Sequence, residues 1–255
     1  MKISIIGAGN LATNLANALH KAGHEIIEVY NRTLENATQL AGMVDAQSVG
    51  NLRDLSPRAD MFIVSVKDDV VFDMASQLAK YMPNALIVHT AGALDIDVIP
   101  SKRRGVLYPL QTFSKQRLVD FSEIPLFIEA GSHKELDAII GVARSISNKV
   151  LEINGQKRQT LHLAAVFCCN FVNHCAAISQ LILSRNGIPF EVMLPLINET
   201  CEKMNDCLPT EAQTGPARRN DVNVMSGHVD LLNKMNEHEW ADLYELLSKS
   251  IQNIC

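Results

Sequence analysis

The sequence lacks the patterns that define several large classes of protein. Its 6 cysteines form no Cys-x-x-Cys pair and accompany no zinc-type histidine pair, so we expect reduced thiols, a cytoplasmic location and no metal site. Lysines and arginines number 23, aspartates and glutamates 28, and the formal net charge is -5. Without a basic excess, nucleic acid is not an expected partner.

Long uninterrupted apolar runs are missing as well. The apolar start, residues 1–6, is too short for a signal peptide. The most apolar segment, within residues 160–185, is interrupted by Asn170, Asn173 and His174, whereas a bilayer-spanning helix needs roughly 18 consecutive apolar residues. We therefore expect no membrane association. What the chain does have is 47% hydrophobic residues, which is typical of a globular protein with a buried core.

The first half of the chain alternates short apolar runs with longer amphipathic stretches, a pattern typical of βαβ units. Strand 61–66 is apolar almost throughout, as expected when helices cover both faces of a sheet. The predicted fold is therefore α/β, with a doubly wound sheet. Strands are predicted at residues 2–6, 25–30, 61–66, 85–89, 105–108, 124–129 and 149–153, and helices at 10–22, 34–42, 69–81 and 132–147.

The pattern changes after Ile153, where residues 154–159 form a polar breaker and strand-like runs stop. We predict a domain at 1–153 and a second, smaller all-helical domain at 154–255. Its helices are expected at 160–185, 190–205 and 222–254. Residues 161–183 are too apolar to stand exposed, so they are expected to pack on the first domain or on a second subunit. Because they are too continuously apolar to be covered on one side only, a homodimer built mainly on the helical half is predicted.

A glycine motif follows the first predicted strand directly, in Gly7-Ala8-Gly9-Asn10-Leu11-Ala12. Gly7 would allow a tight turn and Gly9 a close approach to a pyrophosphate, while Ala12 would let helix and strand pack closely. The N–H groups that begin the helix at Asn10 and Leu11 would face the phosphates. This context predicts a Rossmann-type dinucleotide site, although a purely structural turn would need the same glycines.

The end of the second strand distinguishes NADP from NAD. An NAD enzyme usually places an acidic residue there, but this strand ends in Asn31-Arg32-Thr33. Arg32 can pair with a 2′-phosphate, and Thr33 offers a hydroxyl at the start of the next helix. Glu28, the rival ribose ligand, falls in mid-strand. The sequence therefore favours NADP, and the alternative for Arg32 is an exposed arginine at a helix start.

Two further strand ends are expected at the carboxyl edge of the sheet, where open α/β folds bind ligands. Both could line the nicotinamide half of the cofactor or could simply be tight turns. His89, just before the second of them, is more typical of a buried histidine than of a catalyst. The residues concerned are Ser65, Val66 and Lys67 at one end and Thr90, Ala91 and Gly92 at the other.

A polar stripe interrupts the apolar helix predicted at 160–185. His162 and Asn170 belong to it, together with Asn173 and His174. Buried polar groups without partners cost roughly 1–3 kcal/mol each, so the stripe either lines a cavity or forms structural hydrogen bonds. In the first case His162 would be a general acid or base and Asn170 would orient a substrate.

The loop at residues 213–221 combines rigid turn residues with two arginines. Arg219, with Thr214, is the candidate contact to a substrate carboxylate or phosphate, and Asp221 is a candidate helix cap. The alternative is a capping turn with solvated arginines.

Together these motifs resemble a family of Rossmann-like proteins with a helical C-terminal domain of unknown function. The resemblance includes His-Thr-Ala-Gly at 89–92, Tyr-Pro-Leu-Gln-Thr-Phe at 108–113 and Thr-Gly-Pro at 214–216. That family is similar to pyrroline-5-carboxylate reductase, 6-phosphogluconate dehydrogenase and the deazaflavin-dependent NADP oxidoreductases. It implies a cofactor cleft between the domains and a helical domain that usually dimerises, without an assigned substrate.

Two positions depart from the pattern of these relatives. Val166 stands where hydroxyacid dehydrogenases place a lysine before an asparagine, and Asn220 replaces glycine in the Arg-Gly-Asp ending of the loop. Two hypotheses follow. The first is an NADP(H)-dependent oxidoreductase acting on a small polar molecule in the interdomain cleft. The second is a non-catalytic NADP(H)-binding sensor or scaffold.

Overall fold

The structure of the chain is a computed structural model, which describes residues 1–254. The chain divides into two compact units, Met1–Asn170 and Phe171–Cys255. All the strands belong to the first unit. The predicted domain boundary at 153/154 falls just after the last strand, whereas the boundary between the compact units lies within the long helix that follows. The domain boundary at 153/154 stays a prediction.

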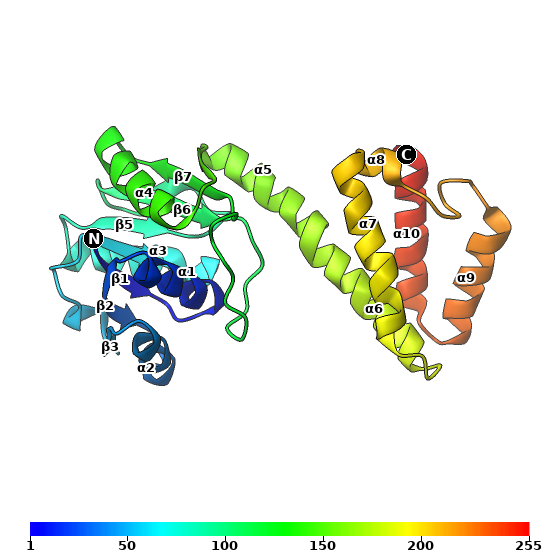
Figure 1. Cartoon of the computed structure of the whole chain (residues 1–255), viewed down its shortest axis with the longest axis horizontal. Helices are drawn as coiled ribbons and strands as arrows, with labels where there is room; N and C mark the ends of the chain where they lie inside the picture. The colour runs from blue at the N-terminus through cyan, green and yellow to red at the C-terminus, as the bar shows by residue number, and fades with distance from the viewer. Residues whose placement is uncertain (255) are drawn as a thin grey trace. The chain divides into compact units, whose positions relative to one another are not determined.

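The first unit is built on a sheet of eight strands in the order β3-β2-β1-β4-β5-β6-β7-β8 (Figure 1). Neighbouring strands are parallel except β6 and β7, which pair antiparallel. The strand order reverses between β1 and β4, so the two halves of the sheet wind in opposite directions from this point. The strands are β1 (Lys2–Ile6), β2 (Glu25–Tyr30), β3 (Gln47–Val49), β4 (Met61–Val64), β5 (Leu86–His89), β6 (Arg104–Pro109), β7 (Leu126–Ala130) and β8 (Val150–Glu152).

Helices cover both faces of this sheet, which confirms the doubly wound prediction. Alternate residues of a strand point to opposite faces: Ile63 on β4 joins one apolar core with α1 (Asn10–Lys21), α2 (Leu34–Met43) and α4 (His133–Ile146). Phe62 and Val64 join the other core with α3 (Asp68–Tyr81). Short 3₁₀ turns lie at Leu52–Asp54 (η1) and Ile96–Val98 (η2). The two cores explain why β4 is apolar along its whole length.

The segment 154–159 is not a breaker but the first turn of helix α5 (Gly155–Ala165). Asn154 caps this helix by accepting a hydrogen bond from the N–H of Lys157 at 2.9 Å. The N–H of Gly155 donates to the Glu129 carboxylate at 3.1 Å. Polar residues and a glycine therefore start the helix here, because they satisfy its free N–H groups.

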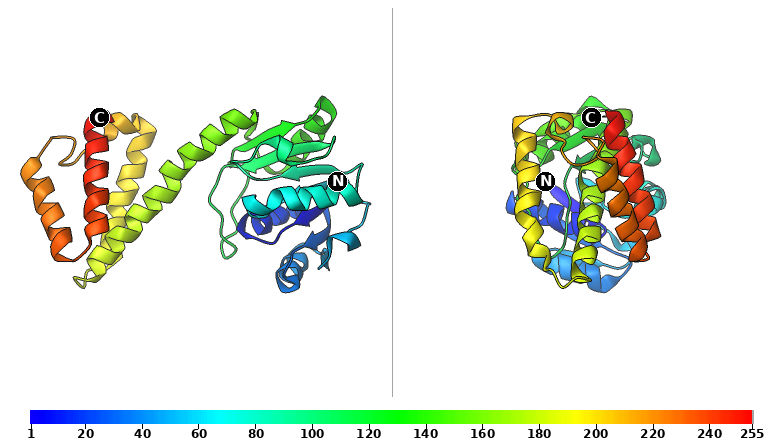
Figure 2. Two further views of the ribbon diagram at one scale, coloured as in Figure 1. Left: turned by 180° about the vertical axis from the view of Figure 1, so that it is seen from behind. Right: turned by 90° about the vertical axis from the view of Figure 1, so that its right-hand side faces the viewer.

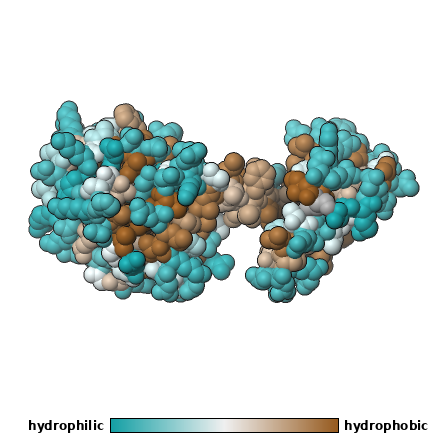
Figure 3. All heavy atoms as spheres, turned by 90° about the horizontal axis from the view of Figure 1, so that it is seen from above, coloured by the Kyte–Doolittle hydropathy of each residue, from teal (hydrophilic) through white to brown (hydrophobic). Residues whose placement is uncertain are grey.

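The helix predicted at 160–185 extends further and is not regular. A π-helical segment, Val166–Phe171 (η3), separates α5 from α6 (Val172–Ser184). Within residues 1–254, Gly155–Ser184 is the one helix long and apolar enough to cross a membrane, judged by length and composition alone. Leu163, with 60% of its surface exposed, and Leu181 are among the exposed apolar residues of this helix. Figure 3 shows apolar residues at the molecular surface.

The second unit is all-helical, as predicted. It contains α6, a 3₁₀ turn at Phe190–Met193 (η4), α7 (Leu194–Asp206), α8 (Pro209–Ala212), α9 (Val222–Lys234) and α10 (His238–Ile254) (Figure 2). The region 222–254 is helical, as predicted, and it forms two helices, with Asn236 in a left-handed φ of 61° between α9 and α10. Among its described residues the buried apolar side chains are few: Ala217, Leu232 and Ala241.

Candidate functional site

A cavity of about 930 Å³ opens at the carboxyl ends of the central strands, within the first unit. Its volume is that of a site for a molecule of cofactor size. Every predicted cofactor residue except Thr33 lines it, together with Tyr30, Asp68, Asp69, Tyr108 and His162. Five neighbouring strands, β2, β1, β4, β5 and β6, lead into it.

The glycine turn between β1 and α1 borders this cavity. Gly7 has a φ of 115°, and a Cβ there would lie 2.1 Å from the carbonyl oxygen of Ser65 at the end of β4. A Cβ on Gly9 would meet no atom within 4 Å, so the backbone there faces open space. Helix α1 has no acidic residue in its first turn and no side-chain cap. This arrangement fits a pyrophosphate held on backbone N–H groups.

The end of β2 presents Arg32 to the same cavity without a competing carboxylate. Arg32 is exposed, and Asn31 beside it donates to the carbonyl oxygen of Thr33 at 3.0 Å. Thr33 occupies the N-cap of α2, but its hydroxyl makes no capping hydrogen bond. Glu28 is buried, accepting from the Ser4 hydroxyl at 3.1 Å and from the N–H of Ser56 at 3.0 Å. Its carboxylate is therefore already bound inside the protein.

Tyr108 and His162 form a hydrogen-bonded pair at the far end of the cavity. Tyr108 comes from the end of β6 and His162 from α5, and the phenolic oxygen lies 3.0 Å from Nδ1 of the imidazole. The two rings meet edge to face, with centroids 5.9 Å apart. Gly92, after β5, makes room for them, since a Cβ there would lie 2.8 Å from Cζ of Tyr108.

Burial sets the protonation state of Tyr108. The residue is 8% exposed, and burial raises the pKa of its phenol because a phenolate would lose its hydration. The Arg158 guanidinium opposes this effect and the Asp68 carboxylate adds to it. Tyr108 is therefore a neutral donor near neutral pH.

Arg158 fixes the start of α5 against the sheet. Its side chain is fully buried, pairs with the Glu129 carboxylate and donates to the carbonyl oxygen of Leu94. A buried arginine without such partners would be strongly destabilising. Arg158 precedes His162 by four residues, about one helical turn, so the same anchor positions His162 at the cavity.

His89 is structural, as its position before the turn suggested. It is fully buried at the end of β5, and its Nδ1 accepts from the N–H of Ala91 at 3.1 Å. Burial and, to a smaller extent, the charge of Arg158 lower its pKa to about 4. His89 therefore stays neutral at physiological pH and shapes the turn that carries Thr90, Ala91 and Gly92.

The other predicted site residues are not part of this cavity. Asn170 is exposed within the π-helical segment and does not line it. Thr214 and Arg219 are exposed in the loop of the second unit. In that loop Asp221 caps α9 by accepting from the N–H of Val224 at 3.3 Å, as predicted. The roles of Asn170, Thr214 and Arg219 in a reaction stay predictions.

Sequence reasoning missed Tyr108 as a site residue. The sequence contained a signal, because Tyr108 begins the motif Tyr-Pro-Leu-Gln-Thr-Phe at the end of a predicted strand. The residues predicted to bind the cofactor follow β1, β2, β4 and β5, whereas Tyr108 lies at the end of β6. Asp68 and Asp69, in the first turn of α3, were also missed, although they directly follow Lys67.

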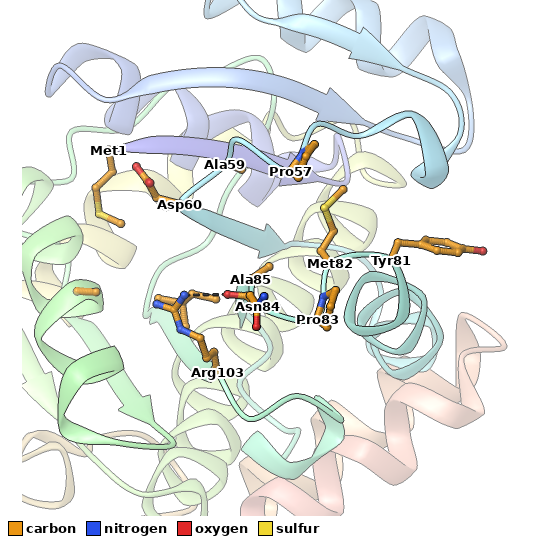
Figure 4. A pocket seen from close by; sticks show the side chains of 12 residues that line it. Met1, Pro57, Ala59, Asp60, Tyr81, Met82, Pro83, Asn84, Ala85 and Arg103 are labelled. Atoms are coloured by element: carbon orange, nitrogen blue, oxygen red, sulfur yellow. Dashed lines mark hydrogen bonds between the residues drawn. The ribbon is translucent and has the colours of Figure 1, made fainter.

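A second cavity, of about 530 Å³, lies at the opposite, amino edge of the sheet (Figure 4). Its polar groups already bind one another or nearby backbone. Arg103 donates to the carbonyl oxygen of Asn84 at 2.8 Å and to the Glu135 carboxylate at 3.0 Å, and Asp60 accepts from the N–H of Lys2. This cavity has no glycine turn or helix N-terminus of the kind that binds a dinucleotide, so the functional site is at the carboxyl edge.

Comparison with known proteins defines the class. Residues 2–92 match the family described as NADP oxidoreductase coenzyme F420-dependent, and residues 124–251 match the domain of unknown function DUF2520. A solved structure from Bacteroides fragilis, provisionally named an NADP oxidoreductase, is 45% identical over 99% of this chain and 98% of that one, with a TM-score of 0.91. The chain belongs to this family of Rossmann-type NADP oxidoreductases with a DUF2520 C-terminal domain, whose cofactor is NADP.

More distant structures share the fold. A Thermotoga maritima protein is 22% identical over 99% of this chain and 98% of that one, with a TM-score of 0.83. An imine reductase from Myxococcus stipitatus in complex with NADP⁺ is 17% identical over 99% and 93%, with a TM-score of 0.71.

Two curated relatives match only part of their length. The L-aspartate dehydrogenase of Methanothermobacter thermautotrophicus is 26% identical over 37% of this chain and 38% of its own. The glycerol-3-phosphate dehydrogenase of Desulfitobacterium hafniense is 30% identical over 37% of this chain and 30% of its own. The chain thus matches about a third of each of these enzymes.

Proposed function

We propose that this protein is an NADP(H)-dependent oxidoreductase acting on a small polar molecule, with His162 as its proton-exchanging group. The observation that supports the proposal most directly is the single cavity in which the glycine turn, Arg32 and the Tyr108–His162 pair meet. When bound, NADP(H) would supply or accept the hydride. The protein would bind the cofactor, orient the substrate and exchange a proton.

The order of the strands suggests how the cofactor would lie. Arg32 follows β2 and would hold the 2′-phosphate, and the turn after β1 would hold the pyrophosphate. The turns after β4 and β5, with Ser65 and Thr90, come next across the sheet and would border the nicotinamide. Neighbouring strands are about 4.8 Å apart, so the end of β6 lies about 14 Å beyond the glycine turn. Substrate would then bind beside Tyr108 and His162.

The experiment is to follow NADPH absorbance with three probes, a cyclic imine, a 2-oxo acid and an aldehyde, for wild type, His162→Gln and Asn170→Ala. Melting temperature and NADPH affinity are measured alongside. Loss of a proton-transferring group should slow turnover roughly 10²–10⁴-fold and leave NADPH affinity intact. If turnover is unchanged in both variants, or if stability is lost while specific activity stays normal, His162 and Asn170 have a structural role and not a catalytic one.

A non-catalytic NADP(H)-binding sensor or scaffold remains the second candidate, because Val166 occupies the position of the lysine used by hydroxyacid dehydrogenases. A sensor would bind NADPH and reduce none of the probes.

The proposed homodimer, built on the helical half, would cover the exposed apolar surface of α5 and α6 whether the protein is an enzyme or a sensor. The proposed location is the cytoplasm, with no nucleic-acid or membrane partner.

A further inference from the structure

We propose that Tyr108 is a second catalytic residue, which donates the proton to the substrate and is reprotonated by His162. The inference rests on the proposed function and adds the order in which the proton moves. It is based on the 3.0 Å contact between the phenolic oxygen and Nδ1, on the burial of Tyr108 and on the position of both residues at one end of the cavity.

The hydrogen-bond capacity of the pair determines where the phenolic hydrogen points. A tyrosine hydroxyl has one hydrogen to donate and can also accept. If His162 is neutral and its Nδ1 accepts, that hydrogen is used within the pair. If His162 is protonated, Nδ1–H donates to the phenolic oxygen, and the hydrogen of Tyr108 is released to point into the cavity. Protonation of His162 therefore turns Tyr108 into a donor toward the substrate.

The proton balance of the reduction follows from this arrangement. As hydride arrives at the carbon of a C=O or C=N bond, the phenolic O–H of Tyr108 breaks and its proton bonds to the substrate oxygen or nitrogen. The Nδ1–H of His162 passes to the phenolic oxygen in the same step. The pair ends as neutral tyrosine and neutral imidazole, and His162 then takes one proton from solvent. The oxidation reaction runs the same steps in reverse.

This order of proton transfers keeps Tyr108 neutral. Burial and the nearby Asp68 carboxylate both oppose a phenolate at Tyr108, although the Arg158 guanidinium moderates that effect. A mechanism that left Tyr108 ionised would be costly, whereas proton transfer from His162 keeps it neutral. His162 is only partly buried, so solvent can reach its imidazole.

Other groups in the cavity are less suited to this role. Asp68 and Asp69 are exposed carboxylates, which accept rather than donate once ionised. Lys67 is exposed at the N-cap of α3, and no hydrogen bond or ion pair holds its ammonium group within residues 1–254. Tyr108 is buried, and hydrogen bonding to a second proton carrier fixes its hydroxyl.

The experiment compares Tyr108→Phe, His162→Gln and the double variant with wild type in the NADPH assay with the same three probes. Tyr108→Phe keeps the ring and removes only the hydroxyl. We expect kcat to fall roughly 10²–10⁴-fold with NADPH Kd changed less than about threefold. Because the two residues act in one relay, the double variant should be no slower than the slower single variant.

Tyr244→Phe is the matched control, since Tyr244 and His228 form another tyrosine–histidine pair, 2.9 Å apart, and neither residue lines this cavity. It should keep wild-type kcat. If wild type reduces a probe and Tyr108→Phe retains its kcat, or if the two single effects multiply in the double variant, the relay is wrong while the proposed function stands. If wild type reduces none of the probes, the proposed function fails and the relay fails with it.

Discussion

A Cβ on Gly92 would lie 2.7 Å from Nδ1 of His162. The same Cβ would lie 2.8 Å from Cζ of Tyr108. Real Cβ atoms do not approach other atoms so closely, so Gly92→Ala would displace both rings and disturb the alignment of the pair. Gly92 does not need a left-handed φ, and His162 is a partly exposed side chain that can move. We therefore expect a folded variant in which kcat falls at least about tenfold, since proton transfer depends on alignment. Steady-state kinetics and thermal melting test this.

The control for that substitution is Gly141→Ala. Gly141 lies within α4, and a Cβ there would meet no atom within 4 Å. Alanine in a helix interior should raise stability by about 0.5–1 kcal/mol and leave kcat unchanged. Wild-type kcat in Gly92→Ala would show that the alignment of the pair does not limit turnover.

Arg32 should determine the preference for NADPH over NADH. Hydrogen bonds to a charged group contribute about 1.5–3 kcal/mol, so Arg32→Ala should weaken NADPH binding by roughly 10- to 100-fold and hardly change NADH binding. Calorimetry measures both affinities. Arg144→Ala, an exposed arginine of α4 outside the cavity, serves as the control. Equal affinity of wild type for NADH and NADPH would contradict the assignment of the 2′-phosphate site.

His89 should make the protein less stable in mild acid. Its folded-state pKa is about 4 against an ordinary value of 6.5, because burial and then Arg158 disfavour the cation. Between these values the unfolded chain binds more protons than the folded one, so stability is full above pH 6.5 and decreases as pH falls toward 4. The loss from this one group would be at most about 3 kcal/mol.

His89→Asn tests that prediction by urea unfolding at pH 7.5 and pH 5. Asparagine can still accept the N–H two residues ahead, as in an Asx turn, but it does not titrate. The variant should lose less stability on acidification than wild type does. An identical loss in both proteins would show that other groups, and not His89, cause it.

The apolar helix surface predicts self-association. Leu181 on α6 is 49% exposed, and a stable dimer interface formed by such residues would exceed about 2,000 Å² in total. Light scattering should give twice the monomer mass at micromolar concentration, and Leu181→Glu should shift it toward the monomer. Lys80→Glu, on the exposed face of α3, should not. A wild-type monomer under these conditions would rule the dimer out.

Much of the first unit could be predicted because the residue pattern of each segment matches the place of that segment in the sheet. Strand β4 is apolar at every position since both faces are covered, and the glycine turn at Gly7 requires a left-handed φ. Strand β3 escaped prediction because it has only three residues, Gln47–Val49, and depends on pairing with β2 for its stability. The π-helical segment at Val166–Phe171 escaped it because no glycine or proline interrupts the helix there, and residue type alone does not distinguish π-helical from α-helical hydrogen bonding.

The parts of the candidate site that lie within one sequence motif could be predicted. The parts formed by contacts between residues far apart in the sequence could not. Gly9 and Arg32 could be placed from strand ends alone. The partnership of Tyr108 with His162 joins residues 54 apart in the chain, and it depends on Arg158 anchoring α5 and on Gly92 leaving room. Those contacts are tertiary, so spacing along the sequence does not reveal them.

The position of Glu28 limits how cofactor preference can be changed. A carboxylate near the end of β2 would ordinarily be the obvious ligand for the ribose of NAD, but this one links Ser4 of β1 to Ser56 beyond β3. Recruiting it would break the contact between β1 and the connection that leads from η1 to β4. Engineering the protein for NADH would therefore need a new acidic side chain at Asn31, which lines the cavity and whose side-chain hydrogen bond is local, to the carbonyl oxygen of Thr33.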